Sequence, residues 1–329
     1  MSFALISKGR VFLLSLFLGT ASSLISGEDH DRYDLSATKE SRWTLSADLL
    51  YWFPSEEVTA IWADVVTSTP EKRSWKAPGF ELKWDVGFRV GAGYNLDHDL
   101  WDTRFYWTYF HTVSTHATSS KPNTSIGAEF FAALLSGDTP RHLKVKWDLF
   151  FNMFDWELGR RYSVSKGLCI RPFIGVKGGW INQKIEATNK DLIVLIFSTN
   201  ASAKERLKNN FWGIGPQGGI QTKWHLYRFL SLLGDFSLAS MWGTWTCRDV
   251  YKTSFSTKST VNTKDSHLGA LMYQGFMGLG WEMGSHFSAQ LGYEMQIWLN
   301  QLRIASFQIQ RLHGDLTFTG VTLRCRLDF

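Results

Sequence analysis

The chain has 329 residues, enough for one large domain or two small ones. Aromatic residues make up 15% of it and include 16 Trp, more than a soluble core needs but what the two interfacial girdles of a membrane protein use. The formal net charge of +5 is small and the basic residues are scattered, which argues against a nucleic-acid partner.

The N-terminus has the order of a secretory signal peptide. Lys8 and Arg10 precede an apolar run at 11–18, and small residues follow it up to Gly27. A transmembrane helix needs about 20 apolar residues, so this run is too short, and no later run is longer. We expect a signal peptide over 1–27, cleaved between 21 and 27, then a periplasmic segment over 28–41 and one domain over 42–329. A buried N-terminal helix is the alternative.

The stretch 84–94 shows the pattern that recurs along the mature chain. Apolar side chains at even positions alternate with Asp85, Arg89 and three glycines at odd positions. A period of two is that of a β-strand with one face towards lipid and one towards a lumen. A helix would mix Asp85 and Arg89 with the apolar residues. The length suits a tilted strand that crosses a bilayer, which takes about 9–11 residues.

Nine further stretches follow the same rule, clearly or more weakly. The clear ones are 42–53, 101–113, 170–180, 287–298 and 319–329, and the weaker ones are 143–158, 210–221, 230–244 and 268–282. The stretch 143–158 changes parity near Phe150 and Phe151, which predicts a β-bulge there.

The connections between these stretches alternate between short and long. Short ones lie at 95–100, 161–167, 223–228 and 284–285, and long polar ones lie at 54–78, 114–141, 187–208, 245–266 and 305–313. Outer-membrane barrels have short periplasmic turns and long extracellular loops. The pattern therefore predicts an all-β transmembrane antiparallel up-and-down β-barrel of about 10 strands (10–14), an even number that leaves both termini in the periplasm. A soluble β-sandwich is the alternative for any single strand.

The charged residues assigned to the inner face are the one group with functional meaning. They are Asp48, Asp85, Arg89, Asp102, Arg104, Lys146, Asp148, Arg171, Lys177, Glu294, Arg324 and Arg326. In a surround of low dielectric constant each charge must be paired or hydrated. Two interpretations stay open: a salt-bridge network that fills a narrow barrel, or a wet pore that sorts solutes by charge.

The sequence contains no motif for catalysis, a cofactor or a metal site. The Gly91 and Gly93 pair lacks a third glycine and lies inside a predicted strand. His98, His111 and His116 lack further ligands at metal-binding spacing. Three cysteines, Cys169, Cys247 and Cys325, are an odd number, and structural thiols are the simplest interpretation. We expect a protein that is not an enzyme and has no catalytic residues, no bound cofactor and no metal.

Several of these stretches resemble the Legionella-type major outer-membrane protein family, which has relatives in chlamydia-like bacteria. They are ADLLYW at 47–52, WDVGFRVGAGYN at 84–95, HDLWD at 98–102, WTYFH at 107–111, RPFIGV at 171–176, NFWGIGP at 210–216, GYEMQIW at 292–298, GDLTFTG at 314–320 and the final Asp-Phe pair. The ordered series covers nearly the whole mature chain. It implies a pore-forming outer-membrane barrel and supplies no catalytic residues.

We therefore expect an outer-membrane protein for passive diffusion of small hydrophilic solutes, envelope integrity, or both. A surface protein whose loops bind host or matrix is one alternative, and a hydrolase active at the extracellular rim is another. The expected partners are outer-membrane lipid, small hydrophilic solutes and the barrel-assembly machinery, which would recognise a terminal signal ending on Phe329. Whether the protein forms a homo-oligomer stays open.

Overall fold

The computed structural model describes residues 42–56, 63–68, 73–76, 83–96, 99–120, 124–128, 139–193, 200–227, 229–254, 258–284, 286–305 and 311–329. The predicted signal peptide and periplasmic segment, as well as His98, lie outside this part of the chain. No helix of the described part is long and apolar enough to cross a membrane.

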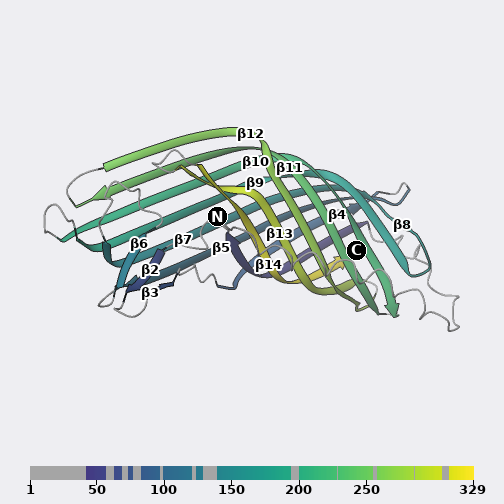
Figure 1. Ribbon diagram of the computed structural model, residues 1–329. Helices are drawn as coiled ribbons and strands as arrows, with labels where there is room; N and C mark the ends of the chain where they lie inside the picture. Colours follow the sequence, from purple (N-terminus) through teal and green to yellow (C-terminus); the bar gives the residue numbers. More distant parts are fainter. Residues whose placement is uncertain are drawn as a thin grey trace, which may run out of the picture. The chain divides into compact units, whose positions relative to one another are not determined.

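Ten long strands of the described residues form the main sheet (Figure 1). They are β1 (Trp43–Glu56), β4 (Asp85–Asn95), β5 (Trp101–Ser119), β7 (Thr139–Arg160), β9 (Leu168–Ile193), β10 (Asn200–Tyr227), β11 (Leu230–Thr253), β12 (Lys258–Glu282), β13 (Phe287–Ala305) and β14 (Arg311–Asp328). The two-residue strand β8 (Tyr162–Ser163) pairs with the start of β9.

The sheet closes on itself, because every long strand pairs with two neighbours. The order is β10-β11-β12-β13-β14-β1-β4-β5-β7-β9, and β9 pairs in turn with β10. All of these pairings are antiparallel. At the seam, the Phe329 N–H donates to the Trp43 carbonyl oxygen at 2.9 Å, and the Trp43 N–H donates to the Phe329 carbonyl oxygen at 2.8 Å. The prediction of an antiparallel barrel of about ten strands is confirmed.

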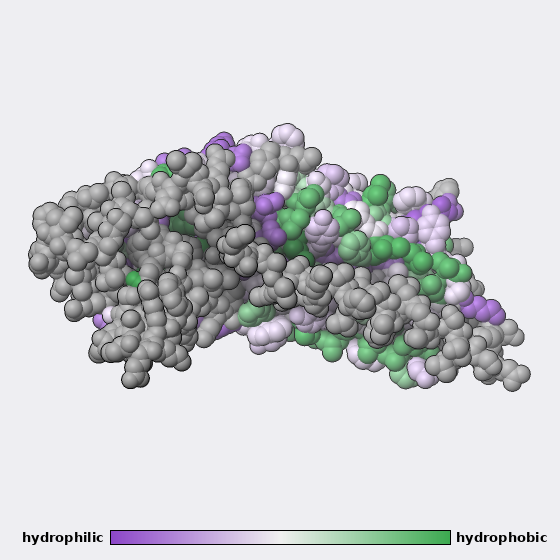
Figure 2. All heavy atoms as spheres, viewed as in Figure 1, coloured by the Kyte–Doolittle hydropathy of each residue, from purple (hydrophilic) through white to green (hydrophobic). Residues whose placement is uncertain are grey.

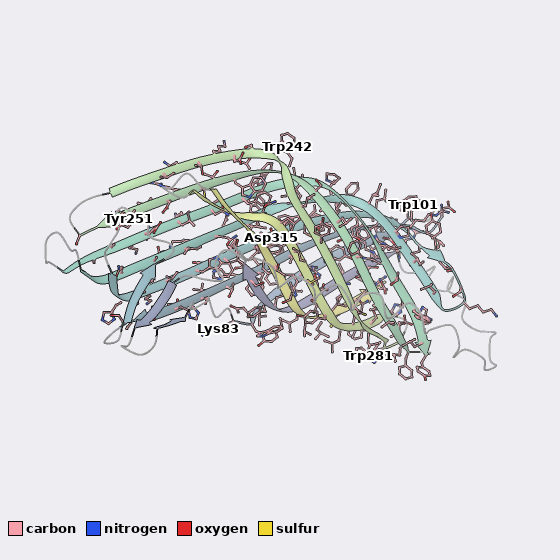
Figure 3. All side chains as sticks on the ribbon, viewed as in Figure 1. Lys83, Trp101, Trp242, Tyr251, Trp281 and Asp315 are labelled. Atoms are coloured by element: carbon pink, nitrogen blue, oxygen red, sulfur yellow. The ribbon has the colours of Figure 1, made fainter. Side chains whose placement is uncertain are left out.

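The outer face of the barrel is apolar over the half that contains the short turns. On β4, Val86, Phe88 and Val90 are exposed, whereas Arg89 between them is 4% exposed. Figure 2 shows hydrophobic side chains gathered over the right-hand part of the view, where β13, β14 and β4 are drawn. Trp242 projects outward at one border of this zone (Figure 3). Apolar and aromatic side chains on the outside are what a lipid-facing belt requires.

The strands extend well past the stretches that alternate most clearly. β10 has 28 residues and β9 has 26, so much of the predicted long connections 187–208 and 245–266 is strand. Their outer faces are polar there, and their inner faces also contain polar residues such as Glu205, Asn209 and Asp249, so the apolar-polar alternation by which strands are recognised is weak.

The predicted bulge in β7 is wrong. The register of β7 with β5 runs from Trp101↔Arg160 to Ser119↔His142 without a shift. Phe151 keeps its place on the inner face, because the inner face itself becomes apolar in this half of the barrel. A register shift does occur elsewhere, between Met241 and Trp242 at the pairing of β11 with β12.

A second, three-stranded sheet is formed by segments between the barrel strands. It contains β2 (Ala63–Ser68), β3 (Arg73–Lys76) and β6 (Thr124–Ala128), in the order β3-β2-β6. Ile126 of β6 is buried and belongs to the same apolar cluster as the inner residues of β7. The predicted loops 54–78 and 114–141 therefore contain regular structure.

Candidate functional site in the lumen

Arg89 is the centre of a buried ion-pair cluster in the lumen, here called the Arg89 cluster: Asp48, Arg89, Glu294 and Arg324. Arg89 Nη2 donates to Glu294 Oε1 at 2.7 Å, and Arg89 Nη1 lies 3.2 Å from Asp48 Oδ2. Arg324 Nε donates to both oxygens of Asp48, at 3.0 and 3.1 Å. β14 and β1 lie between β13 and β4 in the sheet, so the pair between Arg89 and Glu294 links two strands that are not neighbours.

Neutral donors complete the hydrogen bonding of Glu294. Gln274 and Gln296 each donate to its Oε1 at 2.9 Å, and Thr322 Oγ1 donates to its Oε2 at 2.9 Å. Arg89 Nε also donates to Thr108 at 3.0 Å. A buried charge is tolerated when its remaining lone pairs and protons are satisfied in this way. The cluster therefore links the strands of the barrel wall through buried ion pairs whose hydrogen bonds are satisfied.

A second charged group, the Arg171 cluster, lies nearer the short turns and contains Asp102, Arg104, Glu157 and Arg171. Arg171 donates to Asp102 Oδ1 from Nε at 2.8 Å and from Nη2 at 2.5 Å, and to Glu157 Oε2 from Nη1 at 2.7 Å. Arg104 Nε lies 3.2 Å from Asp102 Oδ1. Arg104 also donates to Gln221 of β10 at 3.0 Å, past β7 and β9.

Five aromatic side chains, here called the aromatic layer, fill the lumen beyond the Arg89 cluster. They are Trp52, Phe110, Phe151, Trp298 and Phe318, and each is at most 1% exposed. Phe318 has its ring centroid 5.5 Å from that of Trp52, 5.6 Å from that of Phe110 and 4.8 Å from that of Phe151. Phe151 in turn contacts Trp298 at 5.6 Å.

The contact between Phe151 and Trp298 spans the barrel. It joins β7 to β13, and four strands, β14, β1, β4 and β5, separate these two in the sheet order. The aromatic layer also packs against the Arg89 cluster, because the Arg89 guanidinium carbon lies 5.8 Å from the centroid of the Trp52 ring. On β10 and β11, the ring centroids of Phe211 and Trp245 lie 4.7 Å apart, and both residues belong to the same apolar cluster.

Glycines on the inner face make room for these rings. A Cβ at Gly87 would lie 2.8 Å from a ring carbon of Phe110 and 2.7 Å from a backbone oxygen. Gly213 and Gly243 stand opposite each other on β10 and β11, and a Cβ at either would meet the ring of Phe211. The alternation over 84–94 places Gly87 on the lumen face, but the sequence does not indicate which ring covers it.

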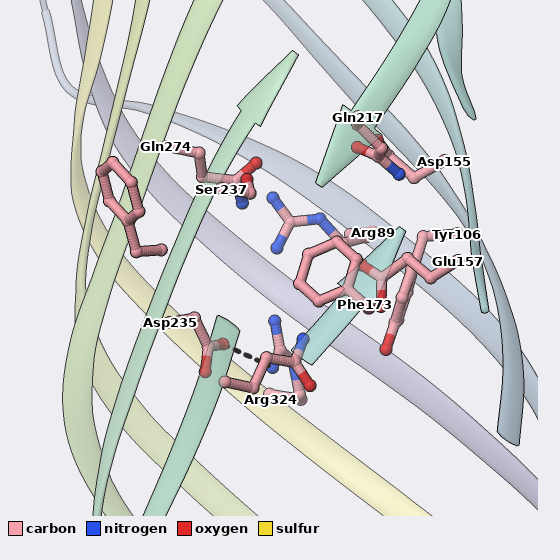
Figure 4. A pocket seen from close by; sticks show the side chains of 12 residues that line it. Arg89, Tyr106, Asp155, Glu157, Phe173, Gln217, Asp235, Ser237, Gln274 and Arg324 are labelled. Carbon is pink, nitrogen blue, oxygen red and sulfur yellow. Dashed lines mark ion pairs between the residues drawn. The ribbon is translucent and has the colours of Figure 1, made fainter. Parts of the chain in front are cut away.

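A small polar cavity of about 40 Å³ lies beside the charged clusters. Its lining includes Arg89, Asp155, Gln217, Asp235 and Arg324, and Figure 4 shows the ion pair between Asp235 and Arg324 at its edge. One water molecule needs about 10–15 Å³ in this measure. The cavity therefore has room for a few waters rather than for a passage.

Ten of the twelve predicted lumen charges lie on the inner face. Seven belong to the Arg89 and Arg171 clusters: Asp48, Arg89, Glu294, Arg324, Asp102, Arg104 and Arg171. Lys177 pairs with Asp155, and Arg326 pairs with Asp328 at 2.8 Å. Asp85, at the end of β4, accepts a hydrogen bond from the Val86 N–H at 2.9 Å.

The other two predicted lumen residues, Lys146 and Asp148, lie on the outside. They alternate with Val145, Trp147 and Leu149, each of which is 0% exposed. Asp148 Oδ1 instead lies 3.0 Å from Nε2 of His111. The assignment failed because it placed the apolar residues of this strand towards lipid, whereas here they face an apolar lumen.

Several residues of the buried networks were not predicted from the sequence. Asp155, Glu157, Asp235 and the glutamines at 221, 274 and 296 contribute to the buried networks. Asp155 and Glu157 alternate with Phe154, Trp156 and Leu158, a signal that a continuous β7 would have revealed. Asp235 falls in a weakly alternating stretch and has no such signal.

No group of three or more His, Cys, Asp or Glu side chains that could hold a metal ion occurs among the residues the structure describes. Cys169 and Cys325 are thiols, and the thiol of Cys247 donates to Asn209 Oδ1 at 3.8 Å.

Comparisons with known proteins place the chain among outer-membrane proteins. The family described as "Legionella pneumophila major outer membrane protein precursor" matches residues 36–329. No curated protein matches the chain. Among solved structures, the outer membrane protease OmpT from Escherichia coli is 9% identical, with a TM-score of 0.46, over 88% of this chain and 97% of that one. A major outer membrane protein from Thermus thermophilus is 8% identical, with a TM-score of 0.34, over 88% of this chain and 100% of that one.

Proposed function

Since the chain belongs to the family of the Legionella pneumophila major outer membrane protein precursor, we propose that this outer-membrane barrel is a structural wall protein with a closed lumen. It is not an enzyme, and it contributes to envelope integrity. The observation that carries the proposal is the contact between Phe151 and Trp298 across the lumen, with all five rings of the aromatic layer buried.

The size of the barrel supports a closed lumen. Side chains fill barrels of about eight strands, and an aqueous channel opens at about 16. Ten strands with five large inward rings are closer to the first case. A solute would have to separate rings that pack in tilted and edge-to-face pairs, and replacing one buried Phe or Trp by Ala costs about 3–5 kcal/mol.

The charged clusters support the same proposal. Two of their ion pairs, Arg89 with Glu294 and Arg171 with Asp102, join strands that are not neighbours in the sheet. Breaking a buried pair by removing one partner costs about 3–5 kcal/mol. Charges held in this way link strands of the barrel wall, and few remain available to bind a passing ion.

A pore for small hydrophilic solutes is the second candidate function. The cavity beside Arg89 and Asp235 favours it, because the cavity has a polar lining and fixed charges of both signs. The family resemblance also implies pore formation. This function requires the aromatic layer to move aside, so it predicts solute flux that depends on the size of those rings.

Depletion of the protein in the bacterium that makes it separates the two functions. We expect increased entry of a bulky hydrophobic dye, with no change in the uptake of small sugars by proteoliposomes that contain the purified protein. Proteoliposomes that swell in small sugars at rates typical of porins, together with an unchanged dye barrier after depletion, would instead establish the pore.

A further inference from the structure

A row of tryptophans marks where the lipid-facing belt ends on the long strands. Trp180 of β9 and Trp212 of β10 stand opposite each other, and Trp242 follows on β11. Most outward side chains beyond this border are polar or charged, as at Lys184 and Lys208. Amphipathic indole rings settle at the membrane–water interface, so this border lies at the level of the lipid head groups. Because the short turns face the periplasm in such barrels, these are the head groups of the outer leaflet.

Six basic side chains gather just beyond that border on the outer face, and we call them the basic patch. They are Lys184, Lys204, Arg206, Lys208, Arg248 and Lys252. The strand register places like charges directly opposite one another. Lys208 faces both Lys184 on β9 and Arg248 on β11, and Lys204 faces Lys252. Directly opposed residues have Cβ atoms about 4.5–5.5 Å apart, and like charges there are destabilising.

One carboxylate neutralises only part of this patch. Glu186 lies 3.0 Å from Lys184, 2.7 Å from Arg206 and 3.8 Å from Lys204. Partial burial opposes ionisation of Glu186, but its hydrogen bond to Lys184 and the charges of Lys204 and Arg206 outweigh this and lower its pKa.

The other basic side chains lack a carboxylate. Among the described residues, no Asp or Glu lies within ion-pair distance of Lys208, Arg248 or Lys252. A groove of about 340 Å³ runs between these side chains, lined also by Lys204, Arg206 and Val250. The patch therefore offers uncompensated positive charge around a space large enough for an anionic group.

We propose that the basic patch binds the phosphate groups of a phosphorylated glycolipid in the outer leaflet. Lys208 lies four residues beyond Trp212 on the same face, about 10 Å further along the membrane normal for a tilted strand. Lipid phosphates lie at that level, next to the chains that contact the belt. Arg and Lys both bind phosphate oxygens through charge-assisted hydrogen bonds. The proposal does not depend on whether the lumen conducts.

Binding of lipid A to the refolded full-length protein in neutral detergent tests the proposal. The double variant Lys208→Gln with Arg248→Gln is compared with Lys83→Gln with Lys166→Gln. The second pair removes the same charge from exposed sites at the start of β4 and in a short turn. Each basic side chain at a membrane surface contributes about a factor of five, so we expect roughly 25-fold weaker binding for the first variant and no change for the second. Heat-modifiable gel mobility shows that both are folded.

Lipid A without its phosphates identifies the group that is bound. We expect it to bind wild-type protein as weakly as bisphosphorylated lipid A binds the patch variant, and we expect added salt to weaken only the phosphorylated form. Equal losses in the two double variants, or equal binding of the two lipids, would overturn the proposal. A soluble sulfated polysaccharide that binds the patch more tightly than lipid A would also overturn it, in favour of a soluble polyanion.

Discussion

Arg89 and Val90 are neighbours in sequence with opposite environments. Arg89 is 4% exposed and donates to Glu294 and Thr108, whereas Val90 is 41% exposed on the lipid face. Alternation along β4 predicts this difference from the sequence alone. The partners of Arg89 come from β1, β5 and β13, and no local pattern indicates them.

The first prediction concerns Arg89. We expect Arg89→Met to lower the free energy of unfolding by about 3–5 kcal/mol, because it leaves Glu294 buried without its cation and removes one of the two cations that pair with Asp48. Adding Glu294→Gln should recover part of this loss, so the two substitutions will not be additive. Urea titration followed by gel mobility measures both effects. Arg89→Met with wild-type stability would mean that water replaces the guanidinium and that the lumen is wet.

The second prediction concerns the lipid face. Val90→Arg should destabilise the barrel by about 2–4 kcal/mol, because it puts a charge into the hydrocarbon near the midplane. Val90→Leu keeps the apolar surface and should fold as the wild type does. The folded fraction in lipid vesicles is the measurement. If Val90→Arg folds as well as Val90→Leu, position 90 does not face hydrocarbon.

At the scale of the strand, prediction depends on a contrast between the two faces. β4, β13 and the end of β14 alternate apolar with polar residues, and each lies where the sequence predicts it. The strand predicted at 143–158 is part of β7, but its predicted bulge is wrong. Leu149, Phe151 and Met153 face an apolar lumen while Phe150 faces outward, so the two faces have similar side chains. The far ends of β9, β10 and β11 are polar outside and resemble loops. The ends of strands therefore cannot be predicted from the sequence wherever the two faces of the strand have similar side chains.

The third prediction concerns the terminal strand. Deleting Phe329 removes two backbone hydrogen bonds to Trp43 at the end of the seam between β1 and β14. We expect export to continue and membrane assembly to fail, while Phe329→Trp, which keeps an aromatic terminus, should assemble. Fractionation of periplasm and outer membrane gives the result. Normal assembly of the truncated protein would show that neither the terminal ring nor its two hydrogen bonds to Trp43 are needed.

At the scale of the whole molecule, the closed barrel could be predicted from the sequence, but the side chains that fill its lumen could not. Strand number and lipid-facing residues follow from alternation, which is a local property. The aromatic layer brings together residues from 52 to 318. Trp52, Phe110 and Trp298 occupy positions that the alternation assigns to a polar lumen, whereas the alternation does not place Phe151 there. The two charged clusters likewise depend on pairings across the barrel that only the closed sheet determines.

Single-channel recording in planar bilayers tests the closed lumen most directly. The samples are wild-type protein and the variant Trp52→Ala with Phe318→Ala, each taken from the folded, heat-modifiable fraction. Removing two rings opens the aromatic layer at its centre, where Phe318 contacts three others. We predict no conductance steps from the wild type and stepwise currents from the variant. Wild-type steps that the double substitution leaves unchanged would contradict a lumen closed by this layer.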